Sequence, residues 1–185
     1  NKIKPKPGGK NQVRQFGEGN FRRAFGEWVL QDVDGKGAIS ADVVVVQPMP
    51  LGRVKDIAAQ DGLYTLRLEG IDKGERVKKS EIIDVIGDCV NPFTDYEKFL
   101  RYGESEDLQI IISNTTEAGI ALDTTDTDFT VCPKSFPGKL LALLKRRYDK
   151  FGGAADKGLV IVPCELIDNN VDVLNRVLTE LAQVT

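Results

Sequence analysis

Histidine is absent from this sequence, and side chains with sulfur or indole groups are scarce. The 185 residues include no histidine, three cysteines, one methionine and one tryptophan. Without histidine, a Ser-His-Asp triad, a Cys-His pair and most catalytic zinc sites cannot be built from these residues. Proton transfer within this chain would have to use lysine, tyrosine, carboxylates or water, and we expect no metal site.

The cysteines and the charge balance exclude further classes of protein. Cys89, Cys132 and Cys164 lie far apart and form no C-x-x-C motif, which is typical of reduced thiols in the cytoplasm. No apolar run approaches the roughly 20 residues of a membrane span, and the first lysines precede no apolar signal region. The net charge of −3 lacks the basic excess of nucleic-acid-binding proteins. We therefore expect a cytoplasmic protein with no membrane and no nucleic-acid partner.

The length and composition favour one folded domain. The chain is 41% apolar and 29% charged, as in ordinary globular proteins, and is long enough for a real core. Residues 1–11 mix lysines with proline and glycine and are predicted to be a flexible basic arm, so that residues 12–185 form the domain. Because the sequence begins at Asn1 and not at methionine, we expect it to be part of a longer polypeptide.

A glycine-containing turn between a strand and a helix is the first functional motif. A short apolar run ends at Phe16, Gly17 and Gly19 follow, and the pattern then becomes helical from about Asn20. Gly17 can take a tight turn, and Gly19 lets a phosphate approach the backbone because it has no Cβ. The free N–H groups of the first helical turn would face that phosphate. The motif predicts an anion cradle, and the alternative is an ordinary glycine-containing turn.

The motif departs from G-x-G-x-x-G at its third glycine. Arg22 occupies that position, and a bulky residue there should hold the helix farther from its strand. We expect Phe21 and Phe25 to fill the wider gap.

A second strand completes a β-α-β unit. The helix is predicted to end near Asp32, and residues 43–46 are a run of four valines without polar alternation, typical of a strand buried on both faces of a parallel sheet. Where dinucleotide enzymes usually place Asp or Glu to hold the adenosine ribose, this chain has Gln47. Glutamine can bind a ribose without repelling a 2′-phosphate, and Arg53 and Lys55 follow. We expect NAD as the cofactor, and NADP is not excluded.

The pattern in the middle of the chain predicts a β excursion, that is, extra strands inserted into the Rossmann unit. Apolar and polar residues alternate over residues 63–68, which predicts a strand with one solvent-exposed face. Gly70–Lys79 is expected to be a charged hairpin loop, and further strands are expected at Val77 and over Ile82–Ile86. Thr94 and Glu97 then form a capping box for a helix through Leu100.

Two more apolar runs, at residues 108–112 and 159–162, predict buried strands. Polar residues follow each run, at the carboxyl edge where open α/β sheets bind ligands. Asn114 and Thr115 have an alternative role as caps of the next segment. With helices predicted from Pro137 and near the C-terminus, the fold class is α/β: a Rossmann-type, doubly wound, mostly parallel sheet with the β excursion inserted.

Five motifs in order resemble the mannitol dehydrogenase family of long-chain polyol dehydrogenases, and the resemblance covers nearly the whole chain. The motifs are Phe16-Gly17-Glu18-Gly19-Asn20-Phe21, Gln60-Asp61-Gly62-Leu63-Tyr64-Thr65, Ser113-Asn114-Thr115-Thr116-Glu117-Ala118-Gly119-Ile120, Phe136-Pro137-Gly138-Lys139-Leu140 and Pro163-Cys164-Glu165-Leu166-Ile167-Asp168.

The resemblance implies an NAD-dependent oxidoreductase that interconverts D-tagaturonate and D-altronate by hydride transfer in hexuronate breakdown. The family carries its catalytic lysine, asparagine and histidine in a helical C-terminal domain, so no catalytic residue is expected in this chain. That domain of the same polypeptide and a small sugar-acid substrate are the expected partners. Alternatives are a mannitol- or fructuronate-type member, a nucleotide-binding module without catalysis, and a methyltransferase using S-adenosylmethionine.

The resemblance also implies roles for individual residues. Those matching its pyrophosphate loop are Gly17, Glu18, Gly19, Asn20, Phe21 and Arg23. Those matching the segment near the nicotinamide ribose are Asn114, Thr115 and Thr116. Cys164 and Glu165 match a strand-end motif facing the substrate, although Glu165 has an alternative role as a helix-start carboxylate. Mannitol-type members have asparagine where Leu166 stands, and relatives usually have glycine where Val171 stands. Lys139 is expected either to pair with the substrate carboxylate or to be a solvated helix residue.

Overall fold

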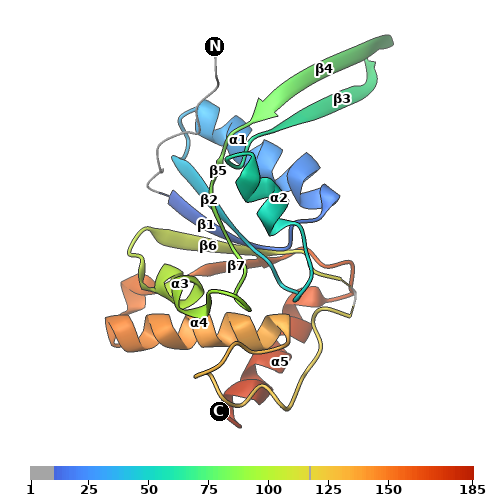
Figure 1. Cartoon of the computed structure of the whole chain (residues 1–185). Helices are drawn as coiled ribbons and strands as arrows, with labels where there is room; N and C mark the ends of the chain where they lie inside the picture. Colours follow the sequence, from blue (N-terminus) through green and yellow to red (C-terminus); the bar gives the residue numbers. More distant parts are fainter. Residues whose placement is uncertain (1–10, 117) are drawn as a thin grey trace.

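Five parallel strands form the central sheet, in the order β5-β2-β1-β6-β7 (Figure 1). The strands are β1 (Asn11–Phe16), β2 (Ala41–Val46), β5 (Ile86–Val90), β6 (Leu108–Ser113) and β7 (Val160–Pro163). The computed structural model describes residues 11–116 and 118–185. From the central β1 the chain builds outward on one side and then crosses to the other, which is the Rossmann order. The predicted fold class is confirmed.

Of the arm predicted over residues 1–11, residues 1–10 lie outside the described residues. Asn11 is the first residue of β1 and therefore belongs to the folded domain. No helix in the described part of the chain is both long enough and apolar enough to cross a membrane.

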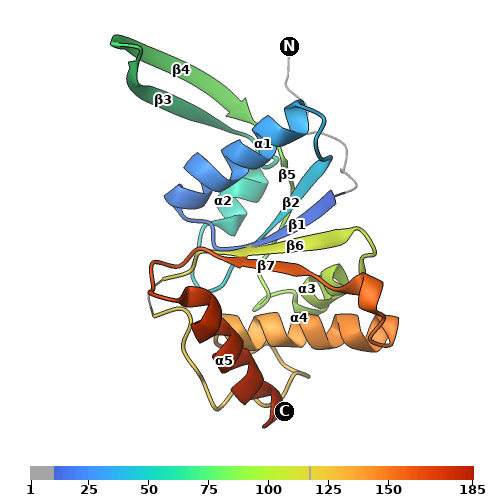
Figure 2. The ribbon, with the colours of Figure 1, turned by 180° about the vertical axis from the view of Figure 1, so that it is seen from behind.

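Helices cover both faces of the sheet (Figures 1 and 2). One face carries α1 (Glu27–Gly35) and α2 (Val54–Ala59), and the other carries α3 (Tyr96–Arg101), α4 (Phe136–Phe151) and α5 (Asn170–Ala182). Shorter helical turns are Arg22–Gly26, Tyr102–Glu104 and Ala155–Lys157. Val43 and Val45 pack into one apolar cluster and Val44 and Val46 into the other. Successive strand residues face opposite sides, which explains why this run contains no polar residue.

The ends of α4 are set by local sequence. Ser135 caps its N-terminus by accepting a hydrogen bond from Gly138 N at 2.9 Å, and Pro137 lies in the first turn. Gly152 ends it in a left-handed conformation with φ of 61°. The capping box predicted for α3 is wrong by one residue, because Asp95 is the cap and accepts from Lys98 N at 3.0 Å.

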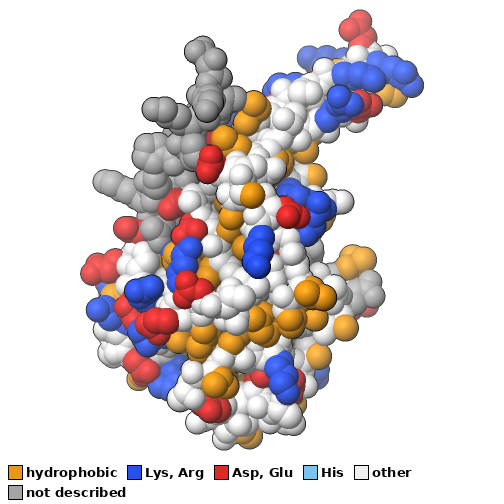
Figure 3. Space-filling model, in the orientation of Figure 1, with side chains coloured by type: hydrophobic (Ala, Val, Ile, Leu, Met, Phe, Trp, Pro, Cys, Tyr) orange, Lys and Arg blue, Asp and Glu red, His pale blue; other side chains and the backbone are white. Residues whose placement is uncertain are grey.

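The β excursion is a long hairpin, β3 (Tyr64–Asp72) paired antiparallel with β4 (Glu75–Ile83). The predicted loop over Gly70–Lys79 is wrong: only Lys73 and Gly74 turn the chain, both at positive φ, as a tight two-residue hairpin requires. Figure 3 shows charged side chains gathered on the projecting hairpin. Ile86, expected in the excursion, instead begins β5 of the main sheet.

The strand predicted at residues 159–162 is β7, an edge strand with one open face. Val160 is 61% exposed and Val162 is 39% exposed, whereas Ile161 packs against the cluster under α4 and α5. The prediction of a buried strand is therefore wrong for one face of β7, because Val160 and Val162 pack into neither apolar cluster.

Candidate functional site

The loop after β1 lies where the sheet reverses its direction of winding, between β2 on one side and β6 on the other. Gly17 N donates to Val46 O at 3.1 Å, which ties the loop to the end of β2. Gly17 has φ of +113°, and a Cβ there would lie 2.6 Å from Asn114 O. Only glycine fits this position, because other residues are strained at such φ and would collide with the neighbouring backbone.

Gly19 and the start of the helix form an open cradle. A Cβ on Gly19 would meet no atom within 4 Å. The first helical hydrogen bond runs from Arg23 N to Gly19 O at 3.3 Å, so the N–H groups of residues 20–22 have no acceptor within the helix. Free amides, open space and the positive end of a helix suit a diphosphate. The backbone has the predicted shape, and phosphate binding by it stays a prediction.

The aromatic residues of the motif do not fill the gap between helix and strand, so that prediction is wrong. Phe21 is 51% exposed and Phe25 is 55% exposed, and their rings stack at 5.5 Å on the surface. Arg22 is buried instead, within a π-helical turn that is wider than an α-helical one. Arg23 turns outward, where its Nη2 donates to Asn20 Oδ1 at 2.6 Å.

A buried polar network supports the loop from below. Gln15 Nε2 donates to Gly17 O at 3.2 Å and to Glu27 Oε1 at 2.6 Å, and Tyr64 lies against the other oxygen of Glu27. Burial raises the pKa of Glu27 and lowers the pKa of Arg22. Sequence reasoning missed this network, although Gln15 is a polar residue inside an apolar strand and was the available signal.

Gln47 is buried at the end of β2 and does not line the large cavity described below. Its Nε2 donates to Met49 O at 2.8 Å and to Pro50 O at 3.1 Å, so both amide hydrogens are used within the turn. The ribose contact expected for Gln47 stays a prediction, and the structure gives this side chain a role in shaping the turn.

The structure brings together the ends of β6 and β7. Asn114 Nδ2 donates to Cys164 O at 2.6 Å. Glu165 Oε1 accepts from Thr115 N at 3.0 Å and from its hydroxyl at 3.2 Å, while Oε2 accepts from Ser113 at 3.1 Å. Glu165 is almost completely buried. Its side chain therefore fixes the segment that was expected beside the nicotinamide ribose.

The alternative roles as caps find no helix to cap: in the described part of the chain none begins between Thr115 and α4, more than twenty positions later, and α5 begins at Asn170, beyond Glu165.

A cavity of about 720 Å³ opens along this edge of the sheet. Its volume is within the usual range of ligand sites. The residues lining it are Gly17, Glu18, Gly19, Pro48, Met49, Asn114, Thr115, Thr116, Ala118, Gly119, Ala121, Leu122, Asp123, Thr124, Lys134, Ser135 and Phe136. A second cavity of about 540 Å³ shares residues 114–116 and adds Glu165 and Leu166. Cys164 lines neither cavity.

Lys139 is fully buried in the first turn of α4, so the expectation of a solvated residue is wrong. Its Nζ donates to Lys134 O at 2.8 Å and to Ser135 O at 3.3 Å, and lies 4.2 Å from the centre of the Phe93 ring. Burial lowers its pKa to about 8. Lys139 therefore holds the backbone of the cavity wall and does not itself line the cavity.

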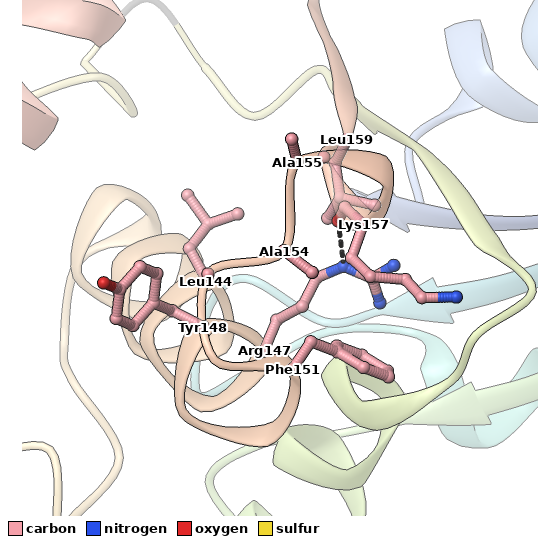
Figure 4. Close-up of a pocket in the computed structure, with 10 residues that line it drawn as sticks. Leu144, Arg147, Tyr148, Phe151, Ala154, Ala155, Lys157 and Leu159 are labelled. Carbon is pink, nitrogen blue, oxygen red and sulfur yellow. Dashed lines mark hydrogen bonds between the residues drawn. The ribbon is translucent and has the colours of Figure 1, made fainter.

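A third cavity, of about 300 Å³, lies at the other end of α4, near the starts of β6 and β7 (Figure 4). Arg147 Nε donates to Lys157 O at 2.8 Å, and its Nη1 donates to Gly103 O at 2.9 Å and to Ser105 O at 2.7 Å. Arg147 thus ties two connections of the sheet to α4. No residue expected to bind a ligand lies here.

The chain has relatives among curated proteins. The altronate oxidoreductase of Bacteroides thetaiotaomicron is 45% identical over 163 residues, which cover 88% of this chain and 34% of that protein. The altronate oxidoreductase of Bacillus subtilis is 43% identical over 173 residues, covering 94% of this chain and 36% of that protein. The chain thus spans about a third of the length of these relatives.

Solved structures show the same fold. Mannitol 2-dehydrogenase of Pseudomonas fluorescens, in a ternary complex with NAD and D-mannitol, superposes with a TM-score of 0.77 at 20% identity, covering 94% of this chain and 37% of that one. A substrate-free D-sorbitol dehydrogenase also gives 0.77, at 23% identity, covering 97% and 38%. The family model described as the mannitol dehydrogenase Rossmann domain matches residues 11–185. The chain therefore belongs to the mannitol dehydrogenase family, of which these residues form the Rossmann domain.

Proposed function

We propose that this chain is the cofactor-binding domain of an NAD-dependent oxidoreductase that interconverts D-tagaturonate and D-altronate. The observation that carries the proposal is the cradle at Gly17 and Gly19, which lies at the reversal point of the sheet where open α/β folds bind dinucleotides. The name shared by the relatives from Bacteroides and Bacillus supports the substrate pair, over the mannitol and fructuronate alternatives.

Different segments along the cavity bind different parts of the dinucleotide. The amides after Gly17 hold the diphosphate, and the segment from Asn114 to Thr116 orients the nicotinamide ribose, with Glu165 fixing that segment. The bound NAD would supply the acceptor and donor of the hydride. This chain provides binding and orientation.

The acid–base chemistry belongs, in this proposal, to a C-terminal domain of the same polypeptide. The relatives are about three times as long as the matched segment, and this chain has no histidine. That domain would supply a catalytic lysine with its asparagine and histidine companions, and the substrate would be a small sugar acid. We also place the protein in the cytoplasm, which its three free thiols support.

The binding part of the proposal is tested by titrating the chain with NADH and following fluorescence or calorimetric heat. Gly19→Ala puts a methyl group into the cradle and should weaken NADH binding at least tenfold. Gly35→Ala is the matched control, because its Cβ also meets no atom within 4 Å but lies at the far end of α1. Failure of the unaltered chain to bind NADH, or equal binding of S-adenosylmethionine, would overturn the proposal.

The catalytic part needs the remaining length of the family. A chimera joining this chain to the last two thirds of the Bacteroides relative should oxidise NADH with D-tagaturonate, and the same chimera with Gly19→Ala should lose most of that rate. If the chimera binds NADH but reduces D-fructuronate or D-fructose in preference to D-tagaturonate, the assigned substrate is wrong.

A further inference from the structure

The end of β2 lacks the carboxylate that usually selects NAD. In Rossmann domains an Asp or Glu there binds the ribose 2′-hydroxyl, and its charge repels a 2′-phosphate. Here the position holds Gln47, which has no charge, is buried and has both amide hydrogens bound to Met49 O and Pro50 O. Selection for NAD therefore cannot come from this strand end.

A carboxylate reaches the same place from the neighbouring loop. Glu18 Oε1 accepts a hydrogen bond from Arg53 N at 3.3 Å, which carries its side chain across from β1 to the turn after β2. A Cβ on Gly52 would collide with Glu18 Oε1 and would lie 2.7 Å from Gln47 Oε1. The Glu18 carboxylate and the Gln47 amide thus lie against the same glycine.

The direction of the Glu18 side chain also resolves a conflict within the glycine loop. A carboxylate aimed into the cradle would repel a diphosphate. The bond to Arg53 N holds the charge away from the amides of the helix start while Glu18 still lines the large cavity, together with Pro48 and Met49. One backbone N–H occupies one of about four acceptor positions of a carboxylate, so the others remain for hydroxyl groups.

We propose that Glu18 determines cofactor specificity: it accepts hydrogen bonds from the adenosine ribose hydroxyls and excludes a 2′-phosphate. The inference rests on the proposed function, since it needs a dinucleotide in the cradle. The side chain of Arg53, whose backbone N–H binds Glu18, is itself paired with another carboxylate, since its Nε faces Asp56 Oδ2 at 3.5 Å.

The test compares dissociation constants of NADH and NADPH for the unaltered chain, two test variants and one control variant. Glu18→Gln keeps the size and the hydrogen bond to Arg53 N but removes the charge, so NADH should bind several-fold more weakly and NADPH more tightly, and the preference for NADH should fall at least tenfold. Glu75→Gln, in the exposed hairpin, is the control and should leave both constants within twofold.

A second variant keeps the charge and displaces it. Gly52→Ala should push Glu18 away from the turn and lower the preference in the same direction, with melting temperatures showing that each variant is folded. If the chain binds NADH but its preference is unchanged within twofold in Glu18→Gln, or if the unaltered chain has no preference, this inference is wrong and the proposed function stands. If the chain binds neither dinucleotide, the proposed function falls and the inference with it.

Discussion

The hydroxyl of Tyr64 lies 2.5 Å from Glu27 Oε2 and 2.6 Å from the carbonyl oxygen of Arg23. A phenol has one hydrogen, so it can donate to only one of these oxygens. Both contacts are hydrogen bonds if Glu27 is protonated and donates to the phenol, which then donates to Arg23 O. Burial, which raises the pKa of Glu27, favours this form. The first residue of the inserted hairpin is thereby joined to the helix beneath the glycine loop.

The first prediction follows from this raised pKa. Because folded Glu27 holds its proton more tightly than the unfolded chain does, its contribution to stability is complete below the ordinary pKa of 4.5 and is lost as pH rises through the folded pKa. Glu27→Gln is permanently neutral and can make the same contacts. The free energy of unfolding of Glu27→Gln, minus that of the unaltered chain, should therefore increase as pH rises from 5 to 8. Urea denaturation measures this difference.

The control for this measurement is Glu75→Gln, an exposed carboxylate in the hairpin. The difference between its free energy of unfolding and that of the unaltered chain should stay constant over the same pH range. A Glu27→Gln variant that loses stability relative to the unaltered chain on going to pH 8 would show that Glu27 is ionised and needed in that form.

The second prediction separates the two glycines of the loop. Gly17→Ala combines a positive φ with a contact of 2.6 Å to Asn114 O, and should lower the free energy of unfolding by at least about 2 kcal/mol. Gly19→Ala meets open space and should change it by less than about 0.5 kcal/mol. Urea unfolding of both variants checks this, and equal losses would mean that the loop has another conformation.

Local sequence signals predicted the parts of the fold that short-range physics determines. The run Val43–Val46 has to be buried on both sides, and Pro137 lies in the first turn of α4 as predicted. The residues that the family motifs singled out lie close together at the carboxyl edge of the sheet: Gly17 approaches Asn114, and Glu165 binds Thr115.

Several failures concern contacts between distant segments. Nothing near Glu27 in sequence indicates Tyr64, which lies 37 positions away. Lys139 was misjudged because a lysine in a first helical turn is usually solvated, whereas here Phe93 covers it. Side-chain partners that are set by tertiary packing cannot be read from periodicity or spacing.

The third prediction concerns Glu165, which accepts three hydrogen bonds from Ser113 and Thr115. Glu165→Ala leaves buried donors without an acceptor and should cost about 2–4 kcal/mol of unfolding free energy. Glu165→Gln keeps one acceptor oxygen and should cost about 1 kcal/mol. Both should weaken NADH binding, because the segment beside the cavity loosens.

Asp168→Asn is the control for Glu165, since Asp168 is an exposed carboxylate three residues later. It should leave unfolding in urea and NADH titration unchanged. If Glu165→Ala behaves like this control in both measurements, the bonds between the ends of β6 and β7 contribute nothing to the site.

The fourth prediction uses the low pKa of Lys139, about 8 against an ordinary value of 10.5. Between these values the unfolded chain keeps its proton while the folded chain has lost it, so Lys139 makes stability rise with pH across this window, by up to about 3 kcal/mol. Lys139→Met should remove the rise, whereas Lys145→Met, on the exposed side of α4, should retain it. Urea denaturation between pH 7.5 and 10 measures both differences. If the free energy of unfolding of the unaltered chain, minus that of Lys139→Met, stays constant or falls as pH rises, the ammonium is stabilised in the folded state and not penalised by its burial.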